Sequence, residues 1–240
     1  MNSANGAFET VAELVRQRPE RSRVFEELGI DFCCHGQLPL DQACVLNRLN
    51  LVDVCRRLEA AEAVPGAERD WTTATLTELT EHIVAVHHAY LRRELPRLAG
   101  LIDRVLDVHG ESHPELRDVR EVYASLQSEL LAHMLKEEQV LFPMVRELER
   151  TPAAQRGNLR LPCGSVSNPV AMMEREHESA GTALQRLERL TRHYTPPADA
   201  CATYRALLSG LAELQSDLHR HIHKENNILF PAAAALGSPA

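Results

Sequence analysis

The chain has 240 residues, enough for one large domain or for a large domain and a small one, and 44% of them are hydrophobic while only 4% are aromatic. A formal net charge of −8 offers no basic face to neutralise phosphates, which argues against nucleic acid as a partner. The polar residues 1–6 are followed by no long apolar run, so we expect neither a signal peptide nor a membrane span, and hence a cytoplasmic protein.

Residues 1–66 are predicted to form a small helical domain. Pro19 and Pro39 suit the first turn of a helix, and Gly29 follows a plausible helix end. The predicted helices cover residues 8–18, 19–28, 40–47 and 51–63. A loop with the sequence Asp-Phe-Cys-Cys-His-Gly, residues 31–36, joins the second helix to the third, and residues 64–70 are predicted to be a linker.

Residues 67–240 are predicted to form four much longer helices. They are expected over residues 76–109, 114–148, 169–193 and 198–230. A helix of about 30 residues is about 45 Å long, more than is usual in a globular protein. Pro96 should kink the first helix or remove one of its backbone hydrogen bonds. The pattern favours an all-α protein with an up-down-up-down four-helix bundle.

An internal repeat joins the second and fourth long helices. The segment 133–143 returns as 221–231 with His, Lys, Glu, Leu, Phe and Pro at equal places. Each copy begins His-x-x-x-Glu, so one imidazole and one carboxylate lie on the same helix face. His88 and His177 stand at matching positions upstream of the two copies. The Leu-Phe-Pro at the end of each copy is expected to serve core packing and to end or kink its helix.

The four histidines recur at nearly equal distances along the chain. The intervals from His88 to His133, from His133 to His177 and from His177 to His221 are 45, 44 and 44 residues. An antiparallel bundle brings such positions to one level, with Glu137 and Glu225 beside them. Imidazole and carboxylate ligands suit iron, manganese or zinc. Six ligands could fill one octahedral ion, but carboxylates that bridge two ions favour a two-metal site with an oxo or hydroxo bridge and an open position on each ion.

The other polar residues near this pattern are not predicted to bind metal. His87 adjoins His88 and is the one histidine that could be confused with it, whereas His219 and His223 should face elsewhere. Glu138 and Glu176 could hydrogen-bond near the metals, but a solvated face is favoured for both. Surface or supporting positions are expected for His82, His109, His113 and His193.

Cys33 and Cys34 are adjacent in the loop 31–36, where an ordinary disulfide between them would be strained. Beside His35, two thiols could ligate iron, react with nitric oxide or pass electrons. The alternative is two small residues buried under a turn. The remaining cysteines are expected to be inert: Cys44, Cys55, Cys163 and Cys201.

The double-cysteine loop followed by His88, His133-x-x-x-Glu137, His177 and His221-x-x-x-Glu225 resembles the iron–sulfur cluster repair di-iron proteins, the ScdA/YtfE or repair-of-iron-centres family. The resemblance covers nearly the whole chain. It implies a hemerythrin-like four-helix bundle with two non-haem iron ions held by those six residues, and the family's cysteine pair at Cys33 and Cys34.

The resemblance further implies repair of iron–sulfur clusters damaged by nitric oxide or oxidants, with damaged iron–sulfur proteins as partners and often a homodimer. Iron donation and nitric oxide reduction remain alternative mechanisms. A hemerythrin-like module that binds or senses dioxygen or nitric oxide without turnover is the first rival. A ferroxidase or iron store is the second, but such sites are typically richer in carboxylates.

Overall fold

The computed structural model describes residues 8–61, 69–156 and 159–237. Within these ranges the protein is helical, with one isolated β-bridge between Thr10 and Pro39. Every described helix is too short or too polar to cross a lipid bilayer. The all-α prediction is thus confirmed.

Four short helices make up the N-terminal part: α1 (Val11–Gln17), α2 (Arg21–Leu28), α3 (Leu40–Leu46) and α4 (Leu51–Ala60). The side chain of Thr10 accepts a hydrogen bond from the amide of Glu13 and caps α1. Gly29 ends α2 in the left-handed conformation, with φ 67°, as the predicted helix end requires. Most of the predicted linker, residues 64–70, lies outside the described residues.

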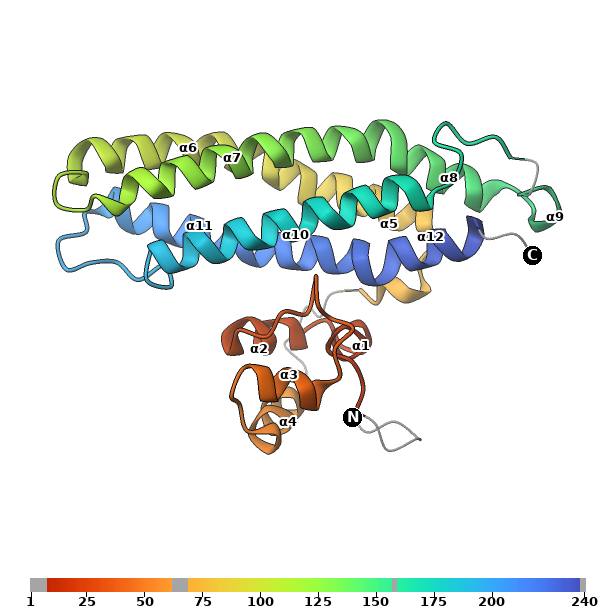
Figure 1. The fold of residues 1–240 in the computed structure, drawn as a ribbon, viewed down its shortest axis with the longest axis horizontal. Helices are drawn as coiled ribbons and strands as arrows, with labels where there is room; N and C mark the ends of the chain where they lie inside the picture. Colours follow the sequence, from red (N-terminus) through yellow and green to blue (C-terminus); the bar gives the residue numbers. More distant parts are fainter. Residues whose placement is uncertain (1–7, 62–68, 157–158, 238–240) are drawn as a thin grey trace.

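The four predicted long helices form the rod-shaped bundle seen in Figure 1. The first consists of α5 (Leu76–His82), η2 (Ile83–His88) and α6 (Ala89–His109), and the second of α7 (Glu115–Lys136), η3 (Glu137–Leu141) and α8 (Phe142–Arg150). The third is α10 (Ser167–Leu190), and the fourth consists of α11 (Ala202–Lys224), η4 (Glu225–Leu229) and α12 (Phe230–Gly237). Two short elements complete the described chain: η1 (Trp71–Thr73) and α9 (Ala153–Arg156). Helix α7 packs against α6 and α10, and α11 packs against α6.

Three of the four long helices contain a π-helical turn, a feature the sequence pattern did not predict. These turns are η2, η3 and η4. A proline follows two residues after η3 and η4, at Pro143 and Pro231. Proline donates no backbone hydrogen bond and its ring needs space in the preceding turn, which a widened turn provides. A helix end at these prolines is therefore wrong, because both helices continue past them.

Pro96 lies inside α6, which runs through it as one helix. Because proline has no backbone N–H, Pro96 cannot donate the hydrogen bond that other residues of α6 donate.

The apolar core divides into two clusters along the bundle. One lies between α6, α7, α10 and α11 and includes Leu95 and Leu126, and the other lies toward α8 and α12 and includes Leu141 and Phe230.

The N-terminal part lies against the side of the bundle, and its loop between α2 and α3 rises toward the bundle's middle (Figure 1). Ile222 of α11 belongs to the N-terminal apolar cluster. The ring of Phe32 packs edge-on against His219, with centroids 5.8 Å apart, and also contacts His223. The hydroxyl of Ser216 donates to the carboxylate of Glu26. The double-cysteine loop is thereby fixed on the bundle.

Candidate metal centre

The π-helical turns lie at the level where the six predicted ligands meet. His88 is the last residue of η2, while Glu137 and Glu225 are the first residues of η3 and η4. A π-turn adds a residue to the turn and so shifts the side chains on one side of it relative to those on the other. Here the shift occurs next to the polar side chains that face the bundle interior. His133 and His221 sit one turn before the two glutamates.

Each glutamate directs its two oxygens at two different histidines. Glu137 places Oε2 3.2 Å from His88 Nε2 and Oε1 3.3 Å from His133 Nε2. Glu225 places Oε1 3.2 Å from His221 Nε2 and Oε2 3.1 Å from His177 Nε2. A carboxylate held in this way is arranged to bridge two centres.

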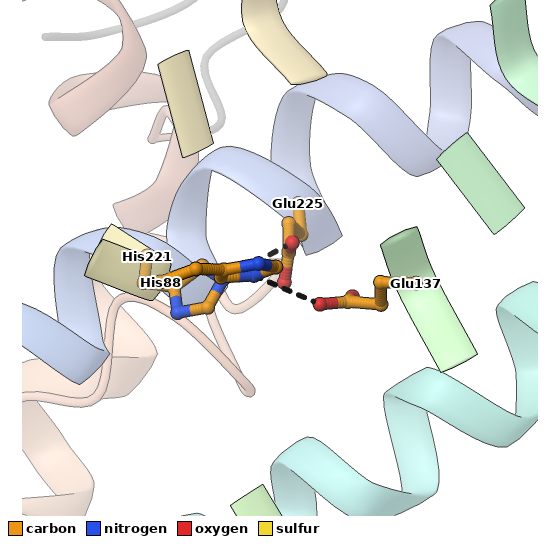
Figure 2. Close-up of side chains that lie close together, drawn as sticks. All are labelled: His88, Glu137, His221 and Glu225. Atoms are coloured by element: carbon orange, nitrogen blue, oxygen red, sulfur yellow. Dashed lines mark hydrogen bonds and ion pairs between the residues drawn. The ribbon is translucent and has the colours of Figure 1, made fainter. Parts of the chain in front are cut away.

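The six residues accordingly form two overlapping groups. One, drawn in Figure 2, contains His88, Glu137, His221 and Glu225, and the other contains His133 and His177 with the same two glutamates. Within each group the ligand atoms lie within 4.8 Å of one another. Each group offers two imidazole nitrogens and one oxygen from each carboxylate.

Burial and unmet hydrogen bonds show that cations fit this arrangement. The side chains of Glu137 and Glu225 are fully buried, and those of the four histidines are at most 4% exposed. Both oxygens of Glu137, Oε2 of Glu225 and Nε2 of His88 are buried without a hydrogen bond from any described residue. Removing one unpaired charge from water costs several kcal/mol. Four inward-facing imidazole nitrogens around two buried carboxylates can be satisfied by metal ions.

The pKa shifts of the buried histidines and glutamates also favour positive charge at the centre. Burial lowers the pKa of His133, but the carboxylates of Glu137 and Glu225 outweigh it and raise the value to about 9. Burial raises the pKa of Glu225, but the imidazoles of His221 and His177 bring it well below its ordinary value. The centre therefore has a strong preference for positive charge.

Three of the four imidazoles are oriented by an acceptor at Nδ1. Glu138 accepts from His88 at 2.6 Å, Glu176 accepts from His133 at 2.9 Å, and Asn226 accepts from His177 at 2.8 Å. Such bonds orient metal-binding imidazoles and raise their basicity. The favoured solvated face is thus wrong for Glu138 and Glu176, whose side chains are 24% and 29% exposed. Their carboxylates are in turn held by Arg92 and Lys136.

Asn226 was missed although the repeat contains the signal for it. It follows Glu225 as Glu138 follows Glu137, and both contact the histidine of a neighbouring helix. The repeat breaks at the fourth imidazole. Glu176 directly precedes His177, and the matching position before His88 is occupied by His87. The ring of His87 stacks on that of His221, with centroids 5.2 Å apart. His221 Nδ1 is left buried with no hydrogen-bond partner among the described residues.

His87 is the centre of a separate buried network. It contacts Asp217 through Nδ1 at 3.0 Å and Lys224 through Nε2 at 2.8 Å. Burial lowers the pKa of His87 to about 4, despite the contact with Asp217. The structure thus separates His87 from His88, the pair that the sequence could have confused, because His88 faces the carboxylate of Glu137 whereas His87 faces that of Asp217.

The double-cysteine loop lies next to one side of the centre. The carboxylate of Asp31 accepts the backbone N–H groups of Cys33 and Cys34 at 3.0 and 2.9 Å and fixes the turn. Cys34 Sγ lies 3.8 Å from the carbonyl oxygen of His177, and Asn226 Nδ2 donates to the carbonyl of Cys33 at 3.3 Å. Neither thiol belongs to the two groups of ligand atoms.

The two thiols of the loop differ in environment. Their Sγ atoms are 3.7 Å apart, and both cysteines are free. Cys33 is buried, whereas Cys34 is partly exposed. Contact with Cys34 and burial raise the pKa of Cys33 well above its ordinary value. Cys33 is therefore a protonated thiol at neutral pH, and Cys34 is the more accessible member of the pair.

Comparison with known proteins gives two family matches. Residues 79–233 match the hemerythrin HHE cation binding domain, and residues 7–62 match the ScdA_N domain, whose function is described as unknown. The chain is 36% identical to a probable iron-sulfur cluster repair protein of Haemophilus influenzae, over 94% of this chain and 96% of that protein. It is 36% and 38% identical to the iron-sulfur cluster repair proteins YtfE of an Enterobacter species and of Cronobacter sakazakii, each over 94% of this chain and 96% of the relative. The chain therefore belongs to the ScdA/YtfE family, with a hemerythrin-type cation-binding domain behind an ScdA_N domain.

Proposed function

We propose that the centre holds two non-haem iron ions and that the protein takes part in the repair of iron–sulfur clusters damaged by nitric oxide or oxidants. The observation that carries the two-ion proposal is the placement of the carboxylates. Each of Glu137 and Glu225 turns its two oxygens toward two different histidines, one in each group. The names of the relatives support the repair role.

In this proposal His88 and His221 would hold one ion, His133 and His177 would hold the other, and Glu137 and Glu225 would each offer one oxygen to either ion. Bound iron would supply one-electron chemistry and a position for a small ligand such as nitric oxide or dioxygen. The chain's own residues set the charge, orient the imidazoles through Glu138, Glu176 and Asn226, and bury the six side chains in the bundle interior. With only two carboxylates for two ions, the donor set is compatible with release of iron to a damaged cluster.

The cysteine loop is the proposed contact between the centre and a client. Cys34 is partly exposed and touches the backbone of His177, which is one of the proposed ligands. We infer that Cys33 and Cys34 act with the centre, as transient ligands to iron that leaves it, when a damaged iron–sulfur protein docks. The free state of all six cysteines suits a reducing compartment such as the cytoplasm. We also propose that the protein forms a homodimer, and its mass in analytical ultracentrifugation tests this.

Metal content tests the centre first. Iron, zinc and manganese are measured per chain after anaerobic purification of the wild type, of a His133→Ala, Glu137→Ala variant and of an exposed-site control, His193→Ala. We expect about two irons per chain in the wild type and the control, and loss of iron in the double variant. An iron content that does not respond to the double substitution contradicts the centre.

The repair role is tested with an iron–sulfur hydro-lyase inactivated by nitric oxide. We expect iron-loaded protein to restore its activity and a Cys33→Ala, Cys34→Ala variant with full iron content to do so more slowly. Equal rates would remove the cysteines from the mechanism. The rival function is reversible binding of dioxygen or nitric oxide without turnover, which a cation-binding domain of this type is also compatible with. A reversible spectral change with dioxygen and no restored client activity would select it.

A further inference from the structure

Another cluster of side chains that can bind a metal lies at the end of the bundle away from the proposed iron centre. His109 is the last residue of α6, and His113 lies in the turn before α7. Asp199 and Cys201 lie in the connection that leads from α10 into α11. Both connections meet at the same end of the rod (Figure 1). The 21 residues of α6 separate His109 from His88, about 30 Å along the helix, so this cluster is distinct from the proposed iron centre.

The donor atoms of the cluster converge across the two connections. His113 Nε2 lies 3.1 Å from both carboxylate oxygens of Asp199. His109 Nε2 lies 3.3 Å from Cys201 Sγ. One ligand atom from each of His109, His113 and Asp199 falls within 4.8 Å of the others. Cys201 lies beside His109 but outside this group of three, so its exposed side chain must change rotamer to join the other donors.

The two imidazoles are held in place from the protein side. His113 Nδ1 is 3.1 Å from the carboxylate of Glu115, which leaves Nε2 directed at Asp199. A carboxylate behind the imidazole is the usual arrangement of a metal-binding histidine. The ring of Tyr204, which is 4% exposed, packs against His109 and His113 with centroids 5.4 and 5.7 Å apart. The nitrogen donors are thus oriented before any ion arrives.

We propose that His109, His113, Asp199 and Cys201 bind one divalent ion of the zinc class, which ties the two connections together. Two imidazole nitrogens, one carboxylate oxygen and one thiolate make four ligands, the number that a structural zinc site uses. A thiolate and two imidazoles favour zinc over magnesium or calcium. The charges of the thiolate and Asp199 neutralise the two charges of the ion. Binding releases the thiol proton to solvent.

The environment of Cys201 makes the thiolate accessible at neutral pH. Contact with His109 lowers the pKa of the Cys201 thiol to about 7. The sequence pattern gave no reason to single out this thiol, and it placed His109 and His113 at the surface or in supporting positions. In sequence the four residues form only an H-x-x-x-H at 109–113 and a D-x-C at 199–201, and it is the fold that brings these two segments together.

Alkylation of the thiols of the iron-loaded full chain tests the proposal residue by residue. The protein is treated with iodoacetamide with and without one equivalent of Zn²⁺, and modification of each cysteine is followed by peptide mass spectrometry. We expect zinc to slow alkylation of Cys201 by about tenfold or more, because a metal-bound thiolate is a poor nucleophile. Cys163 is exposed and outside the cluster, and it serves as the internal control.

Two variants complete the test, His113→Gln and Asp199→Asn, with circular dichroism to confirm that both are folded. In each we expect the protection of Cys201 to fall to the level of Cys163. Protection that persists in both variants would show that the thiol binds zinc without the cluster and would overturn the proposal. The proposal is equally overturned by a Cys201 rate that zinc leaves unchanged, or by equal protection of Cys163. None of these outcomes depends on the iron centre or on repair activity.

Discussion

The hydrogen bond from His133 to Glu176 offers the sharpest test of how the proposed centre is supported. Glu176 Oε2 lies 2.9 Å from His133 Nδ1, and Glu176 is also paired with Lys136. Replacing it with glutamine keeps the shape and an acceptor oxygen but removes the negative charge behind the imidazole. His133 then becomes a weaker donor to any ion bound at its other nitrogen.

The expected loss follows from the exposure of the pair. Loss of such a supporting bond typically costs 10–100-fold in metal affinity. The side chain of Glu176 is 29% exposed and its charge is shared with Lys136, so solvent and the lysine weaken its effect on His133. We therefore expect the lower end of that range for Glu176→Gln, about tenfold or about 1.4 kcal/mol.

Transfer of iron to a chromophoric chelator measures the effect. The matched control is Glu178→Gln, a loss of the same charge from an exposed position on the same helix, two residues away. If the centre holds iron as proposed, the iron bound by His133 should leave Glu176→Gln about tenfold more readily than it leaves the control. If the two variants release iron alike, Glu176 does not support the centre and the reasoning from the hydrogen bond fails.

Three further predictions address the fold, the thiols and the metal. Phe230 is 1% exposed and its ring stacks on that of His177. Chemical denaturation should show that Phe230→Ala lowers the free energy of unfolding by about 3–5 kcal/mol. A loss below about 1 kcal/mol would contradict the core position of Phe230. The alkylation rate of Cys201 should rise with pH through a midpoint near 7, because only the thiolate reacts. His109→Asn should move that midpoint to higher pH, since His109 contacts the thiol. A midpoint that the variant leaves unchanged would show that His109 does not act on the thiol. Removal of metal by a chelator should lower the melting temperature, because Glu137 and Glu225 then remain buried without cations; equal melting of both forms would argue against a metal there.

The sequence was most informative where a simple period governs the structure. The helical period and the equal spacing of the histidines predicted four antiparallel helices, and the structure brings the six residues of the pattern together at one level. The same period could not predict η3 and η4, because a π-turn breaks it. Proline inside a helical pattern normally signals a helix end, but the helices continue past Pro143 and Pro231 because a π-turn precedes each.

The supporting residues were harder to predict for a different reason. A glutamate on a helix surface is usually solvated, and only the packing of neighbouring helices turns Glu138 toward His88 and Glu176 toward His133. Docking of the cysteine loop on α10 and η4 likewise depends on contacts between residues more than 140 positions apart, such as Cys34 and His177. The pattern within one segment carries no record of such contacts.

The internal repeat has a consequence for how the centre can work. A pair of identical helical hairpins, each with one histidine and one His-x-x-x-Glu, would supply the same six residues, but it would give both ions the same surroundings. Within one polypeptide the two halves can differ in sequence, and here they do. The first half has His87 at the position of Glu176 in the second half, and the second half has Asn226 at the position of Glu138 in the first. In the proposed two-ion centre, joining the halves in one chain therefore gives the two ion positions different supporting side chains, so the two ions need not be held equally tightly.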